Sequence, residues 1–240
     1  MIQRLEPMDA AKQFVMRHFP LCSGAVLAGS VVRGEATETS DLDIVVFDEN
    51  LPTSYRESVI ELGWCIEVFA HNFTSYQAFF EQDCKRARPS LPRMVAEGFV
   101  LVDHGKVEDI KREAQRLLDQ GPEAWTDETI QLKRYFLTDA LDDLIGCTNK
   151  AEELFVANTL ANLTHEFILR TNRHWVGDSK WIVRELCRYD EEFAERFIDA
   201  FHTFYKLGYK ERIVQIVDEV LAPFGGRLFE GFSLGKEQGA

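Results

Sequence analysis

Two aspartates, Asp41 and Asp43, stand at the start of an apolar run that reads DLDIVVF. Residues spaced i and i+2 point to the same side of an extended strand, so both carboxylates share one side while Leu42 faces the other. Beyond them the run is apolar at every position, which is typical of a central strand covered on both faces. Adjacent like charges at the mouth of a buried strand repel and lose hydration, and a divalent cation that neutralises them is the simplest remedy.

A third acid, Glu67, is the single charged residue of the apolar run WCIEVF. An ionised carboxylate buried there without a partner costs on the order of several kcal/mol, so it requires a cation. If its strand lies beside the strand that holds the aspartates, three carboxylates converge in an oxygen-rich site that suits Mg²⁺. The acids therefore predict a metal site at Asp41, Asp43 and Glu67.

The dipeptide Gly29-Ser30 ends the short apolar run GAVLA and opens a turn. Magnesium in proteins often takes phosphate oxygens as further ligands. A turn without side-chain bulk, with free N–H groups and a serine hydroxyl, can hold such phosphates. Gly-Ser alone is usually a plain turn, and Asp-x-Asp alone is often a solvated strand end. The ordered combination of strand, Gly-Ser, Ser-Asp-x-Asp and a lone acid in a third strand favours a joint role.

The stretch GSVVRGEATETSDLDIVVF, with Glu67 as the third acid, resembles the DNA polymerase β-like nucleotidyltransferase superfamily. Within it, the small size and the helical second half are similar to the antibiotic nucleotidyltransferases, which join a catalytic domain to a helical bundle and adenylylate aminoglycosides or lincosamides. A looser likeness extends through LPRMVAEGFVLVDHG, LTDALDDLIG and NRHWVGDSKWIVREL. The resemblance is specific over residues 27–47, so it implies the superfamily and leaves the acceptor open.

The resemblance implies a role for each residue of this set. Gly29 and Ser30 would bind the phosphates of a nucleoside triphosphate. Asp41 and Asp43 would hold the metals, two Mg²⁺ ions, with Glu67 either as a third ligand or as the general base. An acceptor hydroxyl would then attack the α-phosphorus in line, and pyrophosphate would leave.

Further candidates lie around and beyond that motif. Arg33 and Ser40 match the local pattern, Ser40 as the residue that orients the metal-binding turn and Arg33 either as a nucleotide contact or as a surface arginine. In the antibiotic-modifying relatives an acid of the helical domain can serve as the base. Asp139 and Asp143, at i and i+4 on one helix face, are the candidates here, and a solvated acidic face explains them equally well. Lys180 either reaches the triphosphate or is an ordinary exposed lysine.

The rest of the chain predicts the elements that position these residues. Strand-like runs stop near Gly121-Pro122, and beyond them the apolar residues recur at helical spacing. We therefore expect an α+β protein, with a nucleotidyltransferase domain of mixed β-sheet flanked by helices over residues 1–121 and an all-α helical bundle over residues 122–240. The expected strands are 24–30, 41–50, 63–71 and 98–106, and the expected helices are 8–19, 74–86, 107–120, 127–147, 150–172, 177–188, 191–205 and 208–222.

Composition limits the class of partner. The 27 basic and 40 acidic residues give a formal charge of −13, which argues against an extended grip on nucleic acid and favours a cationic acceptor such as an amine-rich small molecule. Five scattered cysteines indicate neither a disulfide framework nor a zinc site. No stretch has the apolar length of a signal peptide or a membrane span, so we expect a cytoplasmic protein without membrane contact; a homodimer is compatible with these features.

Two functions remain as hypotheses. The first is a Mg²⁺-dependent nucleotidyltransferase that moves a nucleoside monophosphate, AMP from ATP or the equivalent from another nucleoside triphosphate, onto a hydroxyl of a small molecule such as an aminoglycoside antibiotic. The alternative is a minimal nucleotidyltransferase of antitoxin type that modifies or binds a protein partner. A nucleotide sensor without turnover is disfavoured, because no member of the acid set is missing.

Overall fold

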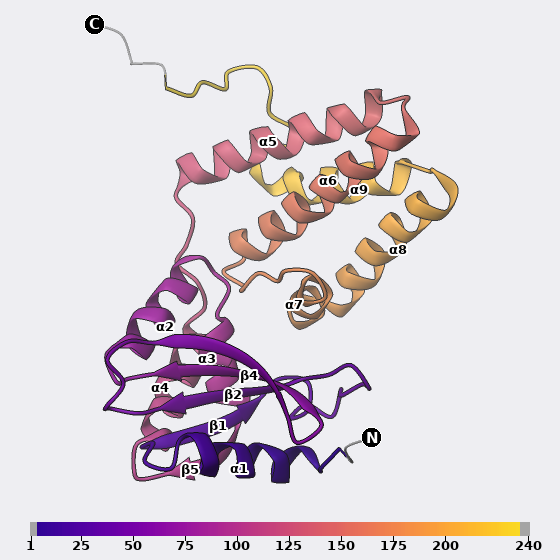
Figure 1. The fold of residues 1–240 in the computed structure, drawn as a ribbon. Coiled ribbons are helices and arrows are strands. Elements are labelled where there is room, and N and C mark those ends of the chain that lie inside the picture. Colours follow the sequence, from indigo (N-terminus) through magenta and orange to yellow (C-terminus); the bar gives the residue numbers. More distant parts are fainter. Residues whose placement is uncertain (1–3, 236–240) are drawn as a thin grey trace, which may run out of the picture. The chain divides into compact units, whose positions relative to one another are not determined.

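A computed structural model describes residues 4–235 of the chain. The chain divides into two compact units, which we call the N-terminal unit (Met1–Gly121) and the helical unit (Pro122–Ala240) (Figure 1). The N-terminal unit combines a sheet with helices, and the described residues of the helical unit contain no strand. The predicted α+β class, with an all-helical second half, is confirmed.

The described residues of the N-terminal unit form a five-stranded mixed sheet with the strand order β3-β4-β2-β1-β5. Strands β2 and β4 run parallel, and the other neighbouring strands are antiparallel. The parallel pair lies at the centre, where both faces of a strand are covered and near-continuous apolar runs are expected. The strands are β1 (Gly24–Ala28), β2 (Leu42–Phe47), β3 (Tyr55–Glu61), β4 (Trp64–His71) and β5 (Phe99–Asp103).

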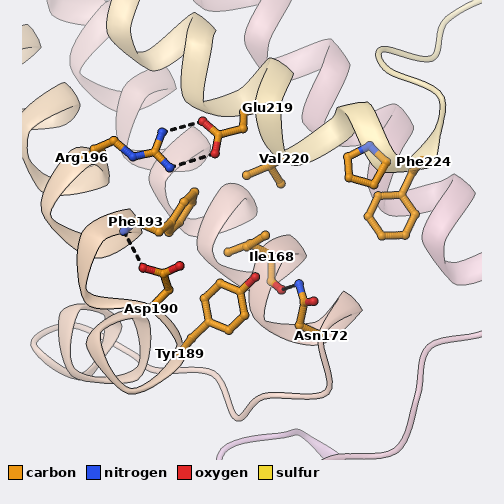
Figure 2. Close-up of a pocket in the computed structure, with 10 residues that line it drawn as sticks. Ile168, Asn172, Tyr189, Asp190, Phe193, Arg196, Glu219, Val220 and Phe224 are labelled. Atoms are coloured by element: carbon orange, nitrogen blue, oxygen red, sulfur yellow. Dashed lines mark hydrogen bonds and ion pairs between the residues drawn. The ribbon is translucent and has the colours of Figure 1, made fainter.

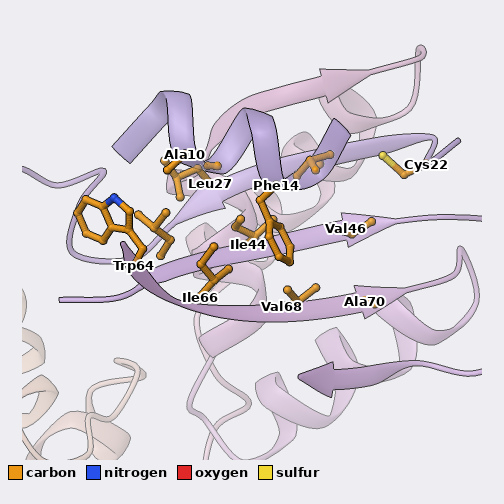
Figure 3. Close-up of a cluster of buried hydrophobic side chains, with 14 residues drawn as sticks. Ala10, Phe14, Cys22, Leu27, Ile44, Val46, Trp64, Ile66, Val68 and Ala70 are labelled. Carbon is orange, nitrogen blue, oxygen red and sulfur yellow. The ribbon is translucent and has the colours of Figure 1, made fainter. Parts of the chain in front are cut away.

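Alternation along β2 divides its side chains between two cores. Ile44 and Val46 point to the face covered by α1 (Pro7–His18), where Phe14 packs against them (Figure 3). Val45 and Phe47 point to the opposite face, which packs against three further helices. These are α2 (Ser75–Lys85), α3 (Ser90–Glu97) and α4 (Val107–Gln120).

Strand β3 is missing from the strands that the sequence predicted. Its residues YRESVIE are mostly exposed, because β3 forms an edge of the sheet and pairs with a strand on one side only, β4. The two-residue turn Leu62-Gly63 has φ of +55° and +81°, the backbone of a type I′ hairpin, whose twist suits antiparallel strands. A polar edge strand lacks the apolar alternation that reveals half-buried strands.

The helix α3 is a second correction to the predicted elements. It lies directly after Pro89 and contains Pro92 within its first turn, where a proline is tolerated because the amide there needs no partner. Leu91 and Val95 bury its inner side against the core of the sheet. Eight residues with two prolines in or beside them show too little helical periodicity to be recognised from the sequence.

The helical unit follows the predicted order of helices. Leu137, Leu141 and Leu144 are fully buried and form the apolar stripe of their helix. The helix expected from residue 177 begins at Trp181 instead, so Lys180 is its N-cap rather than a first-turn residue. The helices are α5 (Asp127–Gly146), α6 (Lys150–Thr171), α7 (Trp181–Tyr189), α8 (Glu191–Leu207), α9 (Glu211–Leu221) and the short 3₁₀ turn η1 (Ala222–Phe224).

The five cysteines are free in the structure. Among the described residues, no helix combines the length and the apolar character that crossing a membrane requires.

Candidate active site

The parallel pairing of β2 and β4 brings the three acids together. In this register Asp43 lies directly opposite Glu67, and Asp41 precedes β2 by one residue. One carboxylate oxygen from each of Asp41, Asp43 and Glu67 lies within 4.8 Å of the others, and all three residues are partly buried. The acids that the sequence placed on separate strands therefore share one small volume.

The alternation of side chains along β2 determines on which face of the sheet this acid cluster lies. Asp43 alternates with Leu42, which is fully buried on the α1 side, so Asp43 shares the opposite face with Val45 and Phe47. Those two apolar residues pack under α2, α3 and α4, whereas the aspartates at the start of the strand are only partly covered. The carboxylates are thus held by a rigid core and still have access to solvent.

The cluster is electrostatically unfavourable without a cation. The pKa of Asp43 is raised to about 6: burial is the largest cause, the charges of Asp41 and Glu67 add to it, and Arg33 and Arg56 act in the opposite direction. Like charges held this close disfavour ionisation of each other. The fold therefore maintains a concentration of negative charge that an added cation would relieve.

Gly29 allows the turn after β1 to approach Asp43. Its φ is +82°, a conformation that other residues rarely adopt, and Ala28 just before it pairs with Asp43 across the strands. A Cβ atom at position 29 would lie 2.1 Å from Oδ2 of Asp43, closer than any real contact. Residue 29 must therefore lack a side chain for its backbone to come this close to the carboxylate of Asp43. The space that a side chain would fill lies next to the acid cluster.

The loop between β1 and β2 is fixed by hydrogen bonds to Ser40. The Ser30 hydroxyl donates to Oγ of Ser40 at 3.2 Å, and the backbone N–H of Thr37 donates to the same oxygen at 2.8 Å. The guanidinium of Arg4 donates to the backbone carbonyl of Ser40 at 2.7 Å. These contacts hold Ser30 next to Ser40, the residue that directly precedes Asp41. Arg4 carries no motif, so the sequence did not single it out.

Two arginines bring positive charge to the acid cluster. Arg33 pairs through Nε with Glu35 at 3.1 Å and through Nη1 with Glu97 at 3.5 Å, which holds its guanidinium near the site. Arg56 donates from Nη2 to Oε2 of Glu67 at 2.5 Å. The sequence missed Arg56 because it lies on β3, the strand that was not predicted. Glu67, expected to need a cation, therefore has one from the chain itself.

Residues 8–76 match the family model described as a nucleotidyltransferase domain. This part of the chain is a nucleotidyltransferase domain. The match contains the turn at Gly29 and all three acids of the cluster, so the resemblance seen in the sequence motif is confirmed at the level of the superfamily.

The comparisons beyond the family model are distant. A solved structure of a nucleotidyltransferase-like protein from Exiguobacterium sibiricum 255-15 is similar over 90% of this chain and 74% of its own, with 11% sequence identity and a TM-score of 0.48. No curated protein matches the chain. The enzyme class of the nucleotidyltransferase domain therefore rests on the family match.

The remaining predicted residues lie in the helical unit. Asp139 and Asp143 are both exposed on α5, one turn apart, on the side away from the buried leucine stripe. Lys180 is exposed at the N-cap of α7. The structure places these residues on the surface of the helical unit, and their catalytic or binding roles stay predictions.

The helical unit also contains a cavity of about 310 Å³ (Figure 2). Three aromatic side chains, Tyr189, Phe193 and Phe224, contribute to its wall. Its lining includes Arg196 and Glu219, which form an ion pair at 2.6 Å. None of the site residues predicted from the sequence lines this cavity, so it is a separate feature of the molecule.

Proposed function

We propose that the domain transfers a nucleoside monophosphate, AMP from ATP, to a hydroxyl of a small-molecule acceptor with the help of Mg²⁺. The observation that supports this most directly is the cluster of Asp41, Asp43 and Glu67 beside the Gly29 turn. Carboxylates at strand ends next to an open backbone turn provide what a metal–triphosphate complex requires, oxygen ligands on one side and N–H donors on the other.

The chemistry of the donor set fits Mg²⁺. The cluster is made of oxygen ligands only, which this hard cation prefers. Burial, together with the charges of Asp41 and Glu67, raises the pKa of Asp43 to about 6, and a bound cation would relieve this penalty on the ionised carboxylate. Bound there, two Mg²⁺ ions would supply charge neutralisation at the attacking and leaving oxygens. The two aspartates are the proposed ligands, with Glu67 as a third ligand or as the base.

The chain's own groups would position the nucleotide. The N–H groups of the turn at Gly29 and the hydroxyl of Ser30 would bind phosphate oxygens, and Ser40 would keep that turn in place through its hydrogen bonds. Arg33 and Lys180 would add positive charge toward the phosphates. This arrangement catalyses mainly by orientation, because phosphoryl transfer needs little covalent participation from the protein.

The hydroxyl that attacks the nucleotide must lose its proton, and a carboxylate that acts as the general base would take it. Glu67 is the candidate within the acid cluster, and Asp139 and Asp143 are the candidates in the helical unit. The formal charge of −13 favours an acceptor that carries amines, such as an aminoglycoside antibiotic. A cationic acceptor would be drawn to an acidic protein before any specific contact forms.

A labelling experiment tests the proposal. The protein is incubated with α-³²P-labelled ATP and Mg²⁺ against aminoglycosides, lincosamides and a cell lysate, with the Asp41→Asn and Asp43→Asn variants as controls. Label on a small molecule that disappears in both variants supports the proposal. Label on a single protein band would instead favour the antitoxin type of function, and transfer that persists in both variants would contradict the site.

A further inference from the structure

Arg56 contacts the acid cluster through Glu67, the acid that the sequence predicted to require a cation. Its Nη2 atom donates to Oε2 of Glu67 at 2.5 Å, a charge-assisted hydrogen bond. Its charge also lowers the pKa of Asp43, so the guanidinium acts on the neighbouring strand as well. Arg56 is therefore a counter-cation for the cluster as a whole.

The position of Arg56 allows its guanidinium to dissociate from Glu67. It is on the edge strand β3, and its side chain is 60% exposed, whereas Glu67 is 25% exposed and held in β4. Its guanidinium also lies over the ring of Phe69 at 4.9 Å, a contact that needs no rigid geometry. A long side chain with one end in solvent loses little when it changes partner.

A metal ion and Arg56 compete for the same carboxylate. An oxygen of Glu67 that accepts a hydrogen bond from the guanidinium has less electron density to offer a cation, and two positive charges on one carboxylate repel each other. A bare divalent ion that binds Glu67 must therefore either displace Arg56, whose charge then loses this partner, or bind beside a second positive charge, and both outcomes weaken its binding. A metal bound to a nucleoside triphosphate brings negative phosphates, which can accept the displaced guanidinium.

We infer that Arg56 is a specificity-determining residue that disfavours free divalent cations at the acid cluster and favours metal that arrives with a nucleoside triphosphate. This inference rests on the proposed function of the site. Arg56, on an edge strand outside the sequence motif, would then couple metal binding to nucleotide binding. Because the Arg56–Glu67 pair is largely exposed, the coupling it contributes is modest, about threefold to fivefold in affinity.

The test is the affinity for Mn²⁺, measured by electron paramagnetic resonance, without nucleotide and with the non-hydrolysable analogue α,β-methylene ATP. In the Arg56→Gln variant, Mn²⁺ alone should bind about threefold to fivefold more tightly than in the wild type. With the analogue present this gain should vanish or become a loss. The ratio of the two affinities, which measures the coupling, should therefore fall by about the same factor or more.

The chain offers a closely matched control. Arg17 forms an ion pair with Glu61 of β3, and the two side chains are 58% and 23% exposed, against 60% and 25% for Arg56 and Glu67. Glu61 is not part of the acid cluster. Arg17→Gln should leave both Mn²⁺ affinities unchanged, and Arg56→Lys, which keeps the charge, should stay close to the wild type. Circular dichroism confirms that each variant is folded.

The failure of the inference can be told apart from the failure of the proposed function. If Mn²⁺ binding depends on Asp43 but Arg56→Gln behaves like Arg17→Gln, the inference is wrong and the metal site stands. An equal gain in affinity with and without the nucleotide analogue would likewise overturn the coupling. If Mn²⁺ binds neither the wild type nor Arg56→Gln, or binds Asp43→Asn as well as the wild type, the proposed site is wrong and the inference with it.

Discussion

Two groups of charged side chains, one in each unit of the molecule, give their acids opposite electrostatic surroundings. In the N-terminal unit, three carboxylates lie within 4.8 Å of one another, and an exposed arginine contacts one of them. In the helical unit, Glu153 is 3% exposed, and it accepts from Lys150 at 2.7 Å and from Lys210 at 2.8 Å. One arrangement raises the pKa of its central acid, Asp43, and the other lowers the pKa of Glu153.

We assign the first group of charges to the proposed function and the charge of Glu153 to stability. Glu153 joins α6 to Lys210, the residue before α9, and its two cations satisfy both carboxylate oxygens. The acids of the cluster repel one another, and the packed sheet beneath them holds them together. Removing an acid should therefore affect activity in one unit and stability in the other.

The largest effect is expected for Asp43→Asn. The amide keeps the shape of the side chain but loses the charge, so nucleotidyl transfer should fall at least roughly 1,000-fold in kcat/KM, on the order of 4 kcal/mol. Since the change removes repulsion from Asp41 and Glu67, the melting temperature without metal should equal or exceed that of the wild type. Activity is measured with labelled ATP and stability by thermal denaturation.

Asp48→Asn is the control for this variant, because Asp48 directly follows β2 at the end remote from the cluster and binds the backbone N–H of Asn50. It should keep its activity. A fully active Asp43→Asn variant, or one that unfolds well below the wild-type temperature, would show that Asp43 is an ordinary structural acid and would remove the contrast between the units.

Gly29→Ala should have the second-largest effect. The new Cβ would lie 2.1 Å from Oδ2 of Asp43, so the carboxylate or the turn must move. A displacement of this size at a site that positions phosphates should lower kcat/KM by about 10-fold to 100-fold. The positive φ of residue 29 adds a stability cost of about 1–2 kcal/mol.

Gly34→Ala separates these two causes. Gly34 also has a positive φ, +72°, but a Cβ atom there meets nothing within 4 Å. It should show a similar loss in the free energy of unfolding, measured with urea, and close to normal kcat/KM. Equal losses of activity in both variants would mean that backbone strain, rather than the approach to Asp43, governs the site.

Glu153→Gln should have the smallest effect, and the effect should be on stability alone. Because Lys150 and Lys210 lower the pKa of Glu153 below its ordinary 4.5, ionised Glu153 stabilises the fold above that pH. This contribution is lost as the pH falls through the lowered folded-state value. The variant should therefore unfold at lower urea concentration at pH 7, and the difference from the wild type should shrink in acid.

Glu152→Gln is the neighbouring control, since Glu152 is exposed and accepts hydrogen bonds from the loop residues Cys147 and Asn149. It should change neither stability nor its pH dependence. Loss of nucleotidyl transfer in folded Glu153→Gln would contradict the assignment of its charge to stability.

Much of the fold could be predicted because its signals are local. The leucine stripe of α5 recurs at helical spacing, and the apolar run of β2 is continuous because both of its faces are buried. The elements that escaped prediction have weak local signals. Strand β3 is polar and exposed at an edge, and α3 is short and interrupted by proline.

The candidate site shows the same division. Arg56 and Arg4 have no sequence motif around them. Each contacts the site through a residue more than ten positions away in the sequence. Such contacts depend on strand order and on the path of the chain. No window of sequence contains that information, so these residues could not be recognised in advance.

By itself, the sequence determined that Asp41 and Asp43 share one side of a strand and that a turn opens at Gly29, because alternation and backbone freedom are properties of neighbouring residues. Only the tertiary structure decided that Glu67 lies opposite Asp43, through the parallel register of β2 and β4. It also decided that Arg56 partners Glu67. Register and counter-ions follow from the pairing of strands distant in the chain, where packing over the whole sheet chooses among alternatives that are locally equivalent.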